Sequence, residues 1–100
     1  MTAIVVAFGL PRPVAEALIH RLAAEGKYAR EPVFNEKMAL RQFSMRQVME
    51  TLKGGTINQG PSKDECGDWR CRIKRRVAGR LVRIVVAIHA TDFLYLISIH

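Results

Sequence analysis

The alternation of hydrophobic and polar residues is clearest in the second half of the chain. Trp69, Cys71 and Ile73 alternate with Arg and Lys, which is the period-two pattern of a strand with one buried and one solvated face. A second apolar stretch follows Ala78-Gly79, a dipeptide that can form a tight turn. The pattern therefore predicts a β-hairpin over residues 69–88.

With this turn, the hairpin register places Ile73 opposite Ile84 and Trp69 opposite Ile88. A slip by one residue would mix apolar and charged side chains on both faces, so the register is well specified. The predicted apolar face holds Trp69, Cys71, Ile73, Val77, Val82, Ile84, Val86 and Ile88. The predicted solvated face holds Arg70, Arg72, Lys74, Arg76 and Arg83, with Leu81, Val85 and Ala87 between them.

A last strand is predicted over residues 93–100, joined to the hairpin by a loop at residues 89–92. Pairing Ile88 with Phe93 places Phe93, Tyr95, Ile97 and Ile99 on the core face. Leu94, Leu96, Ser98 and His100 then share the cationic face, with Ser98 opposite Arg83 and His100 opposite Leu81.

The first half of the chain has helical spacing. Residues 14–25 form an amphipathic pattern that ends at Gly26, and Asn35 is positioned to cap a short helix through Arg41. Residues 27–33 are predicted to be a connector. The apolar run at residues 4–10 is predicted to be a strand or a buried segment.

Ser44 and Gln47 have the spacing of a capping box, and they predict a helix that ends at Gly54-Gly55. Its buried stripe would be Met45, Val48, Met49 and Leu52. Residues 56–59 are a candidate strand, and residues 60–68 a polar loop. The predicted fold is α+β, with N-terminal helices packed on one face of a twisted antiparallel sheet.

Length and charge limit the classes of function. One hundred residues predict a single domain, 1–100, and the formal charge of +7 with a pI near 10.1 favours an anionic partner: nucleic acid, an acidic protein or a membrane surface. Binding to a membrane surface would need a basic amphipathic helix or an anchor, and neither is evident in the sequence. The N-terminal apolar run is too short to span a bilayer and lacks a preceding basic region, so a cytoplasmic protein is expected.

Metal and cofactor chemistry find little support. Cys66 and Cys71 have poor spacing for zinc and no nearby His; Cys71 is expected in the core and Cys66 as a free thiol in a loop. No glycine-rich phosphate loop or dinucleotide fingerprint is present, so no cofactor is expected. The acidic residues at 64, 65 and 68 are interpreted as a solvated loop.

The cationic face is the candidate functional surface. Residues 69–83 contain seven Arg or Lys and no acidic residue. Lys74, Arg83 and His100 are predicted to be catalytic, because cations stabilise charge on a phosphate and a histidine moves protons near neutral pH. The predicted nucleic-acid-binding residues are Arg70, Arg72, Arg76 and Arg80. The alternatives are a charged strand face that maintains solubility and a frayed terminus at His100.

The segment Glu36-Lys-Met-Ala-Leu-Arg-Gln-Phe-Ser44, followed by Val48, Leu52 and Gly54, resembles a family of small bacterial proteins catalogued as a domain of unknown function. In the second half the resemblance rests on Gly67-Asp-Trp-Arg-Cys-Arg-Ile, Ala78-Gly79-Arg80, Val82, the Val-Val-Ala-Ile run and Leu96-Ile-Ser-Ile99. It covers about residues 35–100 and leaves residues 1–34 as an extension with one helix.

The resemblance implies a fold similar to the RelE, ParE and MqsR toxins, an antitoxin protein as partner, and mRNA cleavage, often on the ribosome. Lys74, Arg83 and His100 match the ribonuclease members by position and residue type. One departure matters: the family often has His before a Glu-Arg-Met motif, whereas this chain has Val33 and Phe34 there, and Lys37 replaces the Arg. If that His is catalytic in relatives, this chain either lacks the activity or relies on another residue.

Three functions are therefore compared. The first is a toxin of a type II toxin–antitoxin system that acts as a metal-free endoribonuclease. The second is a non-catalytic basic module that binds nucleic acid or an acidic protein. The third is a ParE-like gyrase poison, which needs no acid/base residue.

Overall fold

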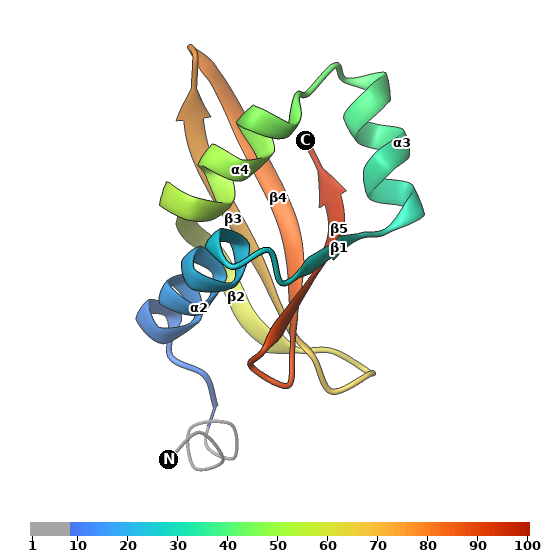
Figure 1. The fold of residues 1–100 in the computed structure, drawn as a ribbon. Coiled ribbons are helices and arrows are strands. Elements are labelled where there is room, and N and C mark those ends of the chain that lie inside the picture. Colours follow the sequence, from blue (N-terminus) through green and yellow to red (C-terminus); the bar gives the residue numbers. More distant parts are fainter. Residues whose placement is uncertain (1–8) are drawn as a thin grey trace.

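The computed structural model describes residues 9–100, which form helices on a five-stranded sheet (Figure 1). The α+β class is confirmed. Of the N-terminal run predicted at residues 4–10, residues 4–8 lie outside the described residues, and Leu10 is buried. The elements are α2 (Arg12–Ala24), β1 (Tyr28–Arg30), α3 (Pro32–Leu40), α4 (Met45–Gly54), β2 (Thr56–Lys63), β3 (Trp69–Val77), β4 (Arg80–His89) and β5 (Phe93–Ile99).

The strands lie in the order β1-β5-β4-β3-β2, and α2 and α4 pack on one face of this sheet while α3 lies beside β5 (Figure 1). The sheet is mixed rather than antiparallel, because β1 pairs with β5 in parallel. The prediction that residues 27–33 are a connector is therefore wrong. Main-chain hydrogen bonds from Leu94 N to Lys27 O (3.0 Å) and from Glu31 N to Leu96 O (2.9 Å) hold this segment at the edge of the sheet.

The β3–β4 hairpin has the predicted register. Trp69 pairs with Ile88 and Ile73 with Ile84. Ala78 and Gly79 both have positive φ, 52° and 78°, as a type I′ turn requires. The apolar face of the hairpin is buried against the helices, and Ile73 and Ile84 are fully buried.

The predicted register of β5 is wrong by one residue. β4 continues to His89, which pairs with Phe93, because Ala90 and Thr91 turn the chain with φ of 50° and 58°. Leu94 and Leu96 are consequently fully buried on the helix side, whereas Phe93, Tyr95 and Ile97 are only partly buried.

A β-bulge then changes the parity of β5. Val86 pairs with Leu96 but Val85 pairs with Ser98, so Ile97 is an extra residue in the ladder. Ile99 returns to the core, and Ser98 lies on the face opposite the helices. The bulge therefore restores the face predicted for Ser98 through a different register.

The helices begin earlier than predicted where proline occupies their first turn. α2 begins at Arg12, after Pro11, and the stop at Gly26 is confirmed by its φ of 73°. α3 begins at Pro32 with Glu31 as N-cap, so Asn35 lies inside the helix and the predicted cap is wrong. In α4 the capping box of Ser44 and Gln47 is present.

One hydrophobic core joins the helices to the sheet. Val48 and Leu52 of α4 are fully buried, and Met45 and Met49 pack against the core from partly buried positions, as the spacing predicted. β2 runs beyond residue 59 to Lys63, so the first part of the predicted loop at 60–68 is strand. None of the helices within residues 9–100 has the length and apolar character needed to cross a membrane.

Candidate catalytic site on the open sheet face

The face of the sheet opposite α2 and α4 is called the open face here. Its central side chains are Arg70, Arg72, Lys74 and Arg76 from β3, Arg83 and Val85 from β4, and Ser98 and His100 at the end of β5. Arg70, Lys74, Arg76 and Arg83 are exposed. The cations predicted from the alternation in β3 are therefore gathered on a solvated surface.

The three predicted catalytic residues form one row across three strands. Lys74 pairs with Arg83. Arg83 in turn pairs with His100, since Arg83 N donates to His100 O (3.0 Å) and His100 N donates to Arg83 O (2.8 Å). The predicted pairings of His100 with Leu81 and Ser98 with Arg83 are wrong, because the turn after His89 and the bulge each shift the register by one residue. His100 is held by the main chain and is not frayed.

Two further cations reach this row from α3 and the residue that follows it. Lys37 Nζ donates to Ser98 Oγ (2.9 Å), and Arg41 Nη1 donates to the Ile99 carbonyl (2.8 Å). Arg41 Nη1 also lies 3.5 Å from His100 Nδ1, and Ser98 Oγ lies 3.2 Å from His100 Nε2. Sequence reasoning did not assign either cation to the site, although their spacing of four places them on one helix face.

These contacts favour a neutral His100. Burial lowers the pKa of the imidazole from its ordinary value of 6.5, and the positive charges of Lys37, Arg41, Arg72 and Arg83 lower it further. With Arg41 donating toward Nδ1, the compatible tautomer carries its proton on Nε2 and donates it to Ser98 Oγ. Nδ1 is then unprotonated, and its lone pair faces the Arg41 guanidinium group.

The open face has little negative charge of its own. Within residues 9–100, no carboxylate oxygen lies within 4.0 Å of a side-chain nitrogen of Arg72, Lys74 or Arg83. Arg70 does have an acidic neighbour, Asp64, at 3.8 Å. Uncompensated cations on adjacent strands repel one another, so an anion bound among them would be stabilised.

The structure separates the four predicted nucleic-acid-binding residues. Arg70, Arg72 and Arg76 lie on the open face, but Arg80 pairs with Val77, whose side chain is on the helix side. The Arg80 guanidinium lies 3.8 Å above the Phe43 ring and donates to the carbonyls of Arg41 (2.5 Å) and Gln42 (3.1 Å). Its donors thus hold the segment that presents Arg41.

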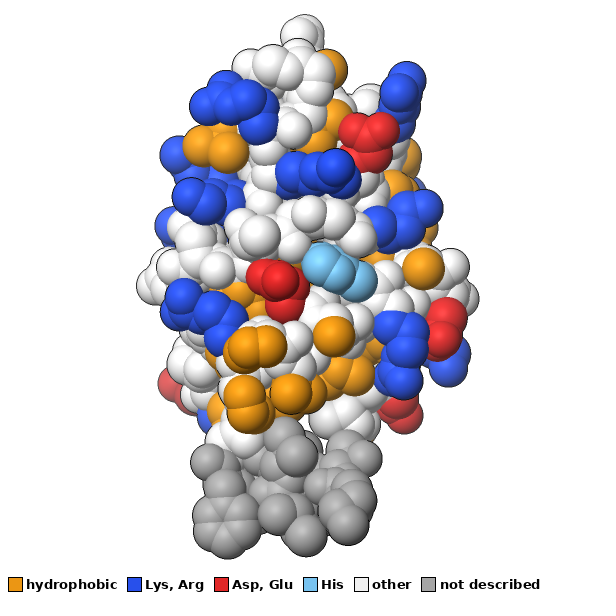
Figure 2. All heavy atoms as spheres, turned by 90° about the vertical axis from the view of Figure 1, so that its left-hand side faces the viewer, with side chains coloured by type: hydrophobic (Ala, Val, Ile, Leu, Met, Phe, Trp, Pro, Cys, Tyr) orange, Lys and Arg blue, Asp and Glu red, His pale blue; other side chains and the backbone are white. Residues whose placement is uncertain are grey.

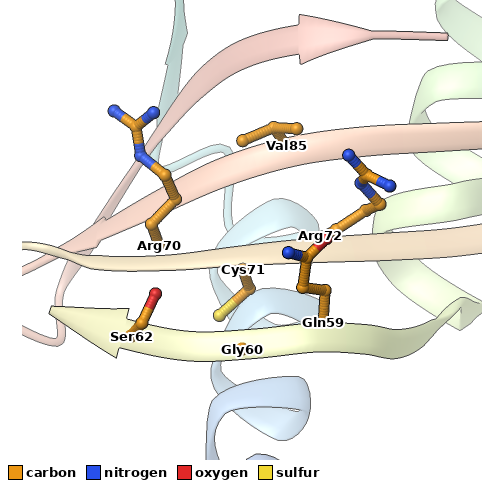
Figure 3. A pocket seen from close by; sticks show the side chains of 7 residues that line it. All are labelled: Gln59, Gly60, Ser62, Arg70, Cys71, Arg72 and Val85. Carbon is orange, nitrogen blue, oxygen red and sulfur yellow. The ribbon is translucent and has the colours of Figure 1, made fainter. Parts of the chain in front are cut away.

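A pocket of about 250 Å³ adjoins the row on the β2 side. Figure 3 shows the side chains of Gln59, Ser62, Arg70, Arg72 and Val85 around it, on strands β2, β3 and β4. Arg72 belongs both to this pocket and to the cations that surround His100. The candidate site and the pocket are therefore continuous.

The remaining candidate groups have structural contacts. Cys71 is buried, which raises the pKa of its thiol to about 12, and Cys66 is exposed and free. His89 Nδ1 lies 2.7 Å from Asp68 Oδ1. Asp64 accepts from Cys66 N and Asp68 N, so this carboxylate orders its own loop. No group of three or more His, Cys, Asp or Glu in the described part of the chain could hold a metal ion.

The side of the molecule seen in Figure 2, which is the left-hand side of Figure 1, has a mixed surface. Lys and Arg lie along both margins and across the upper part, with acidic and hydrophobic side chains between them, and histidine, acidic and hydrophobic side chains lie in the middle and lower part. Cations on this side are therefore interspersed with other groups, unlike the row on the open face.

Comparison with known proteins gives one match. The family model described as a domain of unknown function (DUF4258) matches residues 34–100, which include α3 from Phe34 onward with Lys37, α4, strands β2 to β5 and His100. No curated protein and no solved structure matches the chain. The match covers Lys74, Arg83 and His100.

Proposed function

This chain belongs to the family described as a domain of unknown function (DUF4258), and from that premise we propose that it is a metal-free endoribonuclease that acts as the toxin of a toxin–antitoxin pair. The observation that carries the proposal is the environment of His100. His100, whose pKa is lowered, lies among four cations. Its ring is within hydrogen-bond distance of Ser98, which also accepts from Lys37.

The proposed reaction is attack of a ribose 2′-oxygen on the adjacent phosphorus. Neutral His100 accepts the proton of the 2′-hydroxyl, the new bond from the 2′-oxygen to phosphorus forms, and the bond from phosphorus to the 5′-oxygen breaks. The leaving 5′-oxygen receives a proton from the Lys37 ammonium group. The products are a 2′,3′-cyclic phosphate and a 5′-hydroxyl, and proton transfer from imidazolium to lysine restores both groups.

The guanidinium groups supply the remaining stabilisation. Negative charge grows on the non-bridging phosphate oxygens during attack, and Arg41, Arg72 and Arg83 are the cations that already act on His100. Lys74, opposite Arg83, adds a flexible positive charge at the solvent side of the row. The family resemblance places a histidine elsewhere, near Val33, and His100 replaces it in this proposal.

An antitoxin segment would inhibit by covering the open face. The exposed cations of β3 and β4 suit an acidic partner, and RNA and antitoxin would then compete for the same surface. The likeness to the RelE, ParE and MqsR toxins remains a prediction. The arrangement of helices on a sheet is the one that this resemblance implies, and it supports the proposal to that extent.

The test is cleavage of a 5′-labelled RNA in the presence of EDTA, with product ends identified by mass spectrometry. His100→Ala should lower the cleavage rate by about 100-fold or more, the usual contribution of a general base. His89→Ala is the matched control, because His89 is an exposed histidine paired with Asp68 away from the row. Lys37→Ala should also lower the rate, and Lys74→Ala should lower it less.

Other outcomes decide against the proposal. Full cleavage by His100→Ala would remove the assigned base. RNA binding that weakens steeply with salt, without cleavage by the wild-type protein, would establish the non-catalytic binding module instead. Growth arrest with DNA damage and intact mRNA would identify a gyrase poison.

A further inference from the structure

The pocket beside the catalytic row is formed by irregular pairing between β2 and β3. It lies where β2 departs from a regular ladder: Ile57 pairs with Ile73, Gln59 with Arg72, and Ser62 with Arg70. Gln59 and Ser62 are three positions apart on β2, whereas their partners Arg72 and Arg70 are two positions apart on β3. Two bulges of this kind re-aim side chains, and here they bring Gln59 and Ser62 to the same face as the arginines.

The bulged backbone also explains Gly60. This residue has φ of 86°, and a Cβ placed on it would come within 2.6 Å of the Arg70 carbonyl oxygen. Only glycine permits this close approach of β2 to β3. The strand therefore forms a hollow whose wall is polar on β2, cationic on β3 and apolar at Val85 of β4 (Figure 3).

In this wall, one hydrogen-bond donor of Arg72 has no acceptor. Its Nε is buried and has no partner, and it is the single buried side-chain nitrogen or oxygen within residues 9–100 in that state. An unsatisfied buried donor is costly, most of all on a charged group. A rotation of the guanidinium that turns its Nε edge into the pocket would let an oxyanion accept from Nε and one Nη together.

We propose that this pocket holds one nucleotide of single-stranded RNA, next to the phosphate that faces His100. The inference rests on the proposed function for its substrate class. Arg72 binds the phosphate through its fork of donors, Val85 contacts the flat face of the base or ribose, and the Gln59 amide and Ser62 hydroxyl read polar edges of the base. Arg70 contributes less to the phosphate, because Asp64 already lies 3.8 Å from it.

The size and position of the pocket support a nucleotide over a free anion. A volume of about 250 Å³ is larger than an inorganic phosphate needs, and its lining combines donors, acceptors and an apolar contact. Val85 pairs with Ser98 on one side and Arg72 on the other, so a strand leaving the pocket across β4 arrives at Ser98 and His100. The pocket would then contribute to sequence preference at one position.

The experiment measures binding without cleavage. Fluorescently labelled 2′-O-methyl hexanucleotides have no free 2′-hydroxyl, so they report affinity for the full-length protein whether or not it is a ribonuclease. Arg72→Lys keeps the charge and removes the fork, and it should weaken binding by about tenfold or more, as expected for loss of a charged hydrogen bond. The matched control is Arg75→Lys, the same change on the same strand but on the helix side of the sheet, where its guanidinium donates to the Glu50 carbonyl; it should change affinity by less than about twofold.

A second measurement locates the nucleotide. In the wild-type protein, nucleoside 5′-monophosphates should shift the Arg72 Nε–H signal and the Val85 methyl signals in NMR spectra, whereas inorganic phosphate at the same concentration should leave the methyl signals unchanged. Gln59→Ala should alter the ranking of the four mononucleotides without unfolding the protein, because Gln59 is exposed.

The outcomes separate this inference from the proposed function. RNA cleavage with equal hexanucleotide affinity of Arg72→Lys and Arg75→Lys overturns the pocket and leaves the ribonuclease. Selective loss of affinity in Arg72→Lys without any cleavage by the wild type keeps the pocket and overturns the ribonuclease. Displacement of the hexanucleotide by an acidic peptide that shifts the same Val85 and Arg72 signals would assign the pocket to a protein partner and overturn the inference.

Discussion

Replacing Arg80 with alanine should destabilise the protein without weakening its binding of RNA. The guanidinium donates to two main-chain carbonyls, of Arg41 and Gln42, and stacks at 3.8 Å on Phe43. Hydrogen bonds of this kind contribute about 0.5–1.5 kcal/mol each, because water competes for the same groups. A cation–π contact at a partly exposed site adds about 0.5–1 kcal/mol. The sum predicts a loss of about 1.5–4 kcal/mol in the free energy of unfolding.

Urea unfolding followed by circular dichroism measures this loss. With a typical slope of about 1 kcal/mol per molar urea for a small domain, the midpoint should fall by about 1.5–4 M. Arg76→Ala is the control, since that side chain makes one hydrogen bond, to the Gly79 carbonyl at 3.2 Å, and its midpoint should move far less. Affinity of Arg80→Ala for the 2′-O-methyl hexanucleotide should stay within about twofold of wild type under folding conditions.

The opposite result would refute the reasoning. If Arg80→Ala unfolds at the wild-type urea concentration and loses affinity for the hexanucleotide, Arg80 is a nucleic-acid ligand, as its place in the sequence first predicted. If both properties change, Arg80→Lys separates them: a lysine keeps the charge for RNA but cannot serve both carbonyls and the ring in the same way.

Four further predictions concern the cap, the bulge, the thiols and the proton carrier. Ser44→Ala removes the hydroxyl that accepts from Gln47 N, and it should lower stability by about 1 kcal/mol in urea unfolding. Gly60→Ala places a Cβ against a main-chain oxygen at positive φ, and it should cost more than Gly79→Ala, where a Cβ meets nothing within 4 Å; equal midpoints would contradict this. One thiol, Cys66, should react with a disulfide reagent at pH 8 in the native protein and two after unfolding, because Cys71 is buried and its pKa is raised to about 12. The cleavage rate should rise with pH on the acidic side, with the midpoint of the rise below the ordinary histidine value of 6.5, because the reactive form of His100 is neutral and its pKa is lowered. Arg41→Gln removes one of the charges that lower this pKa, so the rising limb should move to higher pH, and a shift to lower pH would contradict the assignment.

The hairpin shows what could be predicted from the sequence. Its two faces differ so strongly in polarity that only one register buries the apolar set, and Ala78-Gly79 supplied a turn of the right length. The face assignments of Arg70, Arg72, Lys74 and Arg76 followed directly. Periodicity and turn chemistry agreed there, which is the condition under which a local pattern determines a long-range pairing.

β5 shows where the same reasoning fails. Its residues are apolar at both parities, so alternation could not distinguish one face from the other. The correct pairing depends on positive φ at Ala90 and Thr91 and on the extra residue Ile97 in the ladder. The hydrophobic pattern predicts neither feature. The contacts of Lys37 and Arg41 with β5 depend on the packing of α3 beside that strand, which spacing along the chain does not determine.

The extra residue at Ile97 also affects how β5 tolerates substitution and length change. Before it, even-numbered residues are buried; after it, Ile99 is buried and Ser98 and His100 belong to the open face. A scan of polar substitutions along the strand should therefore reverse its odd–even pattern at residue 97. Removal of Ile97 alone would leave Leu96, Ser98 and Ile99 in simple alternation, so shortening the strand at this one position preserves both the core and the row that ends at His100.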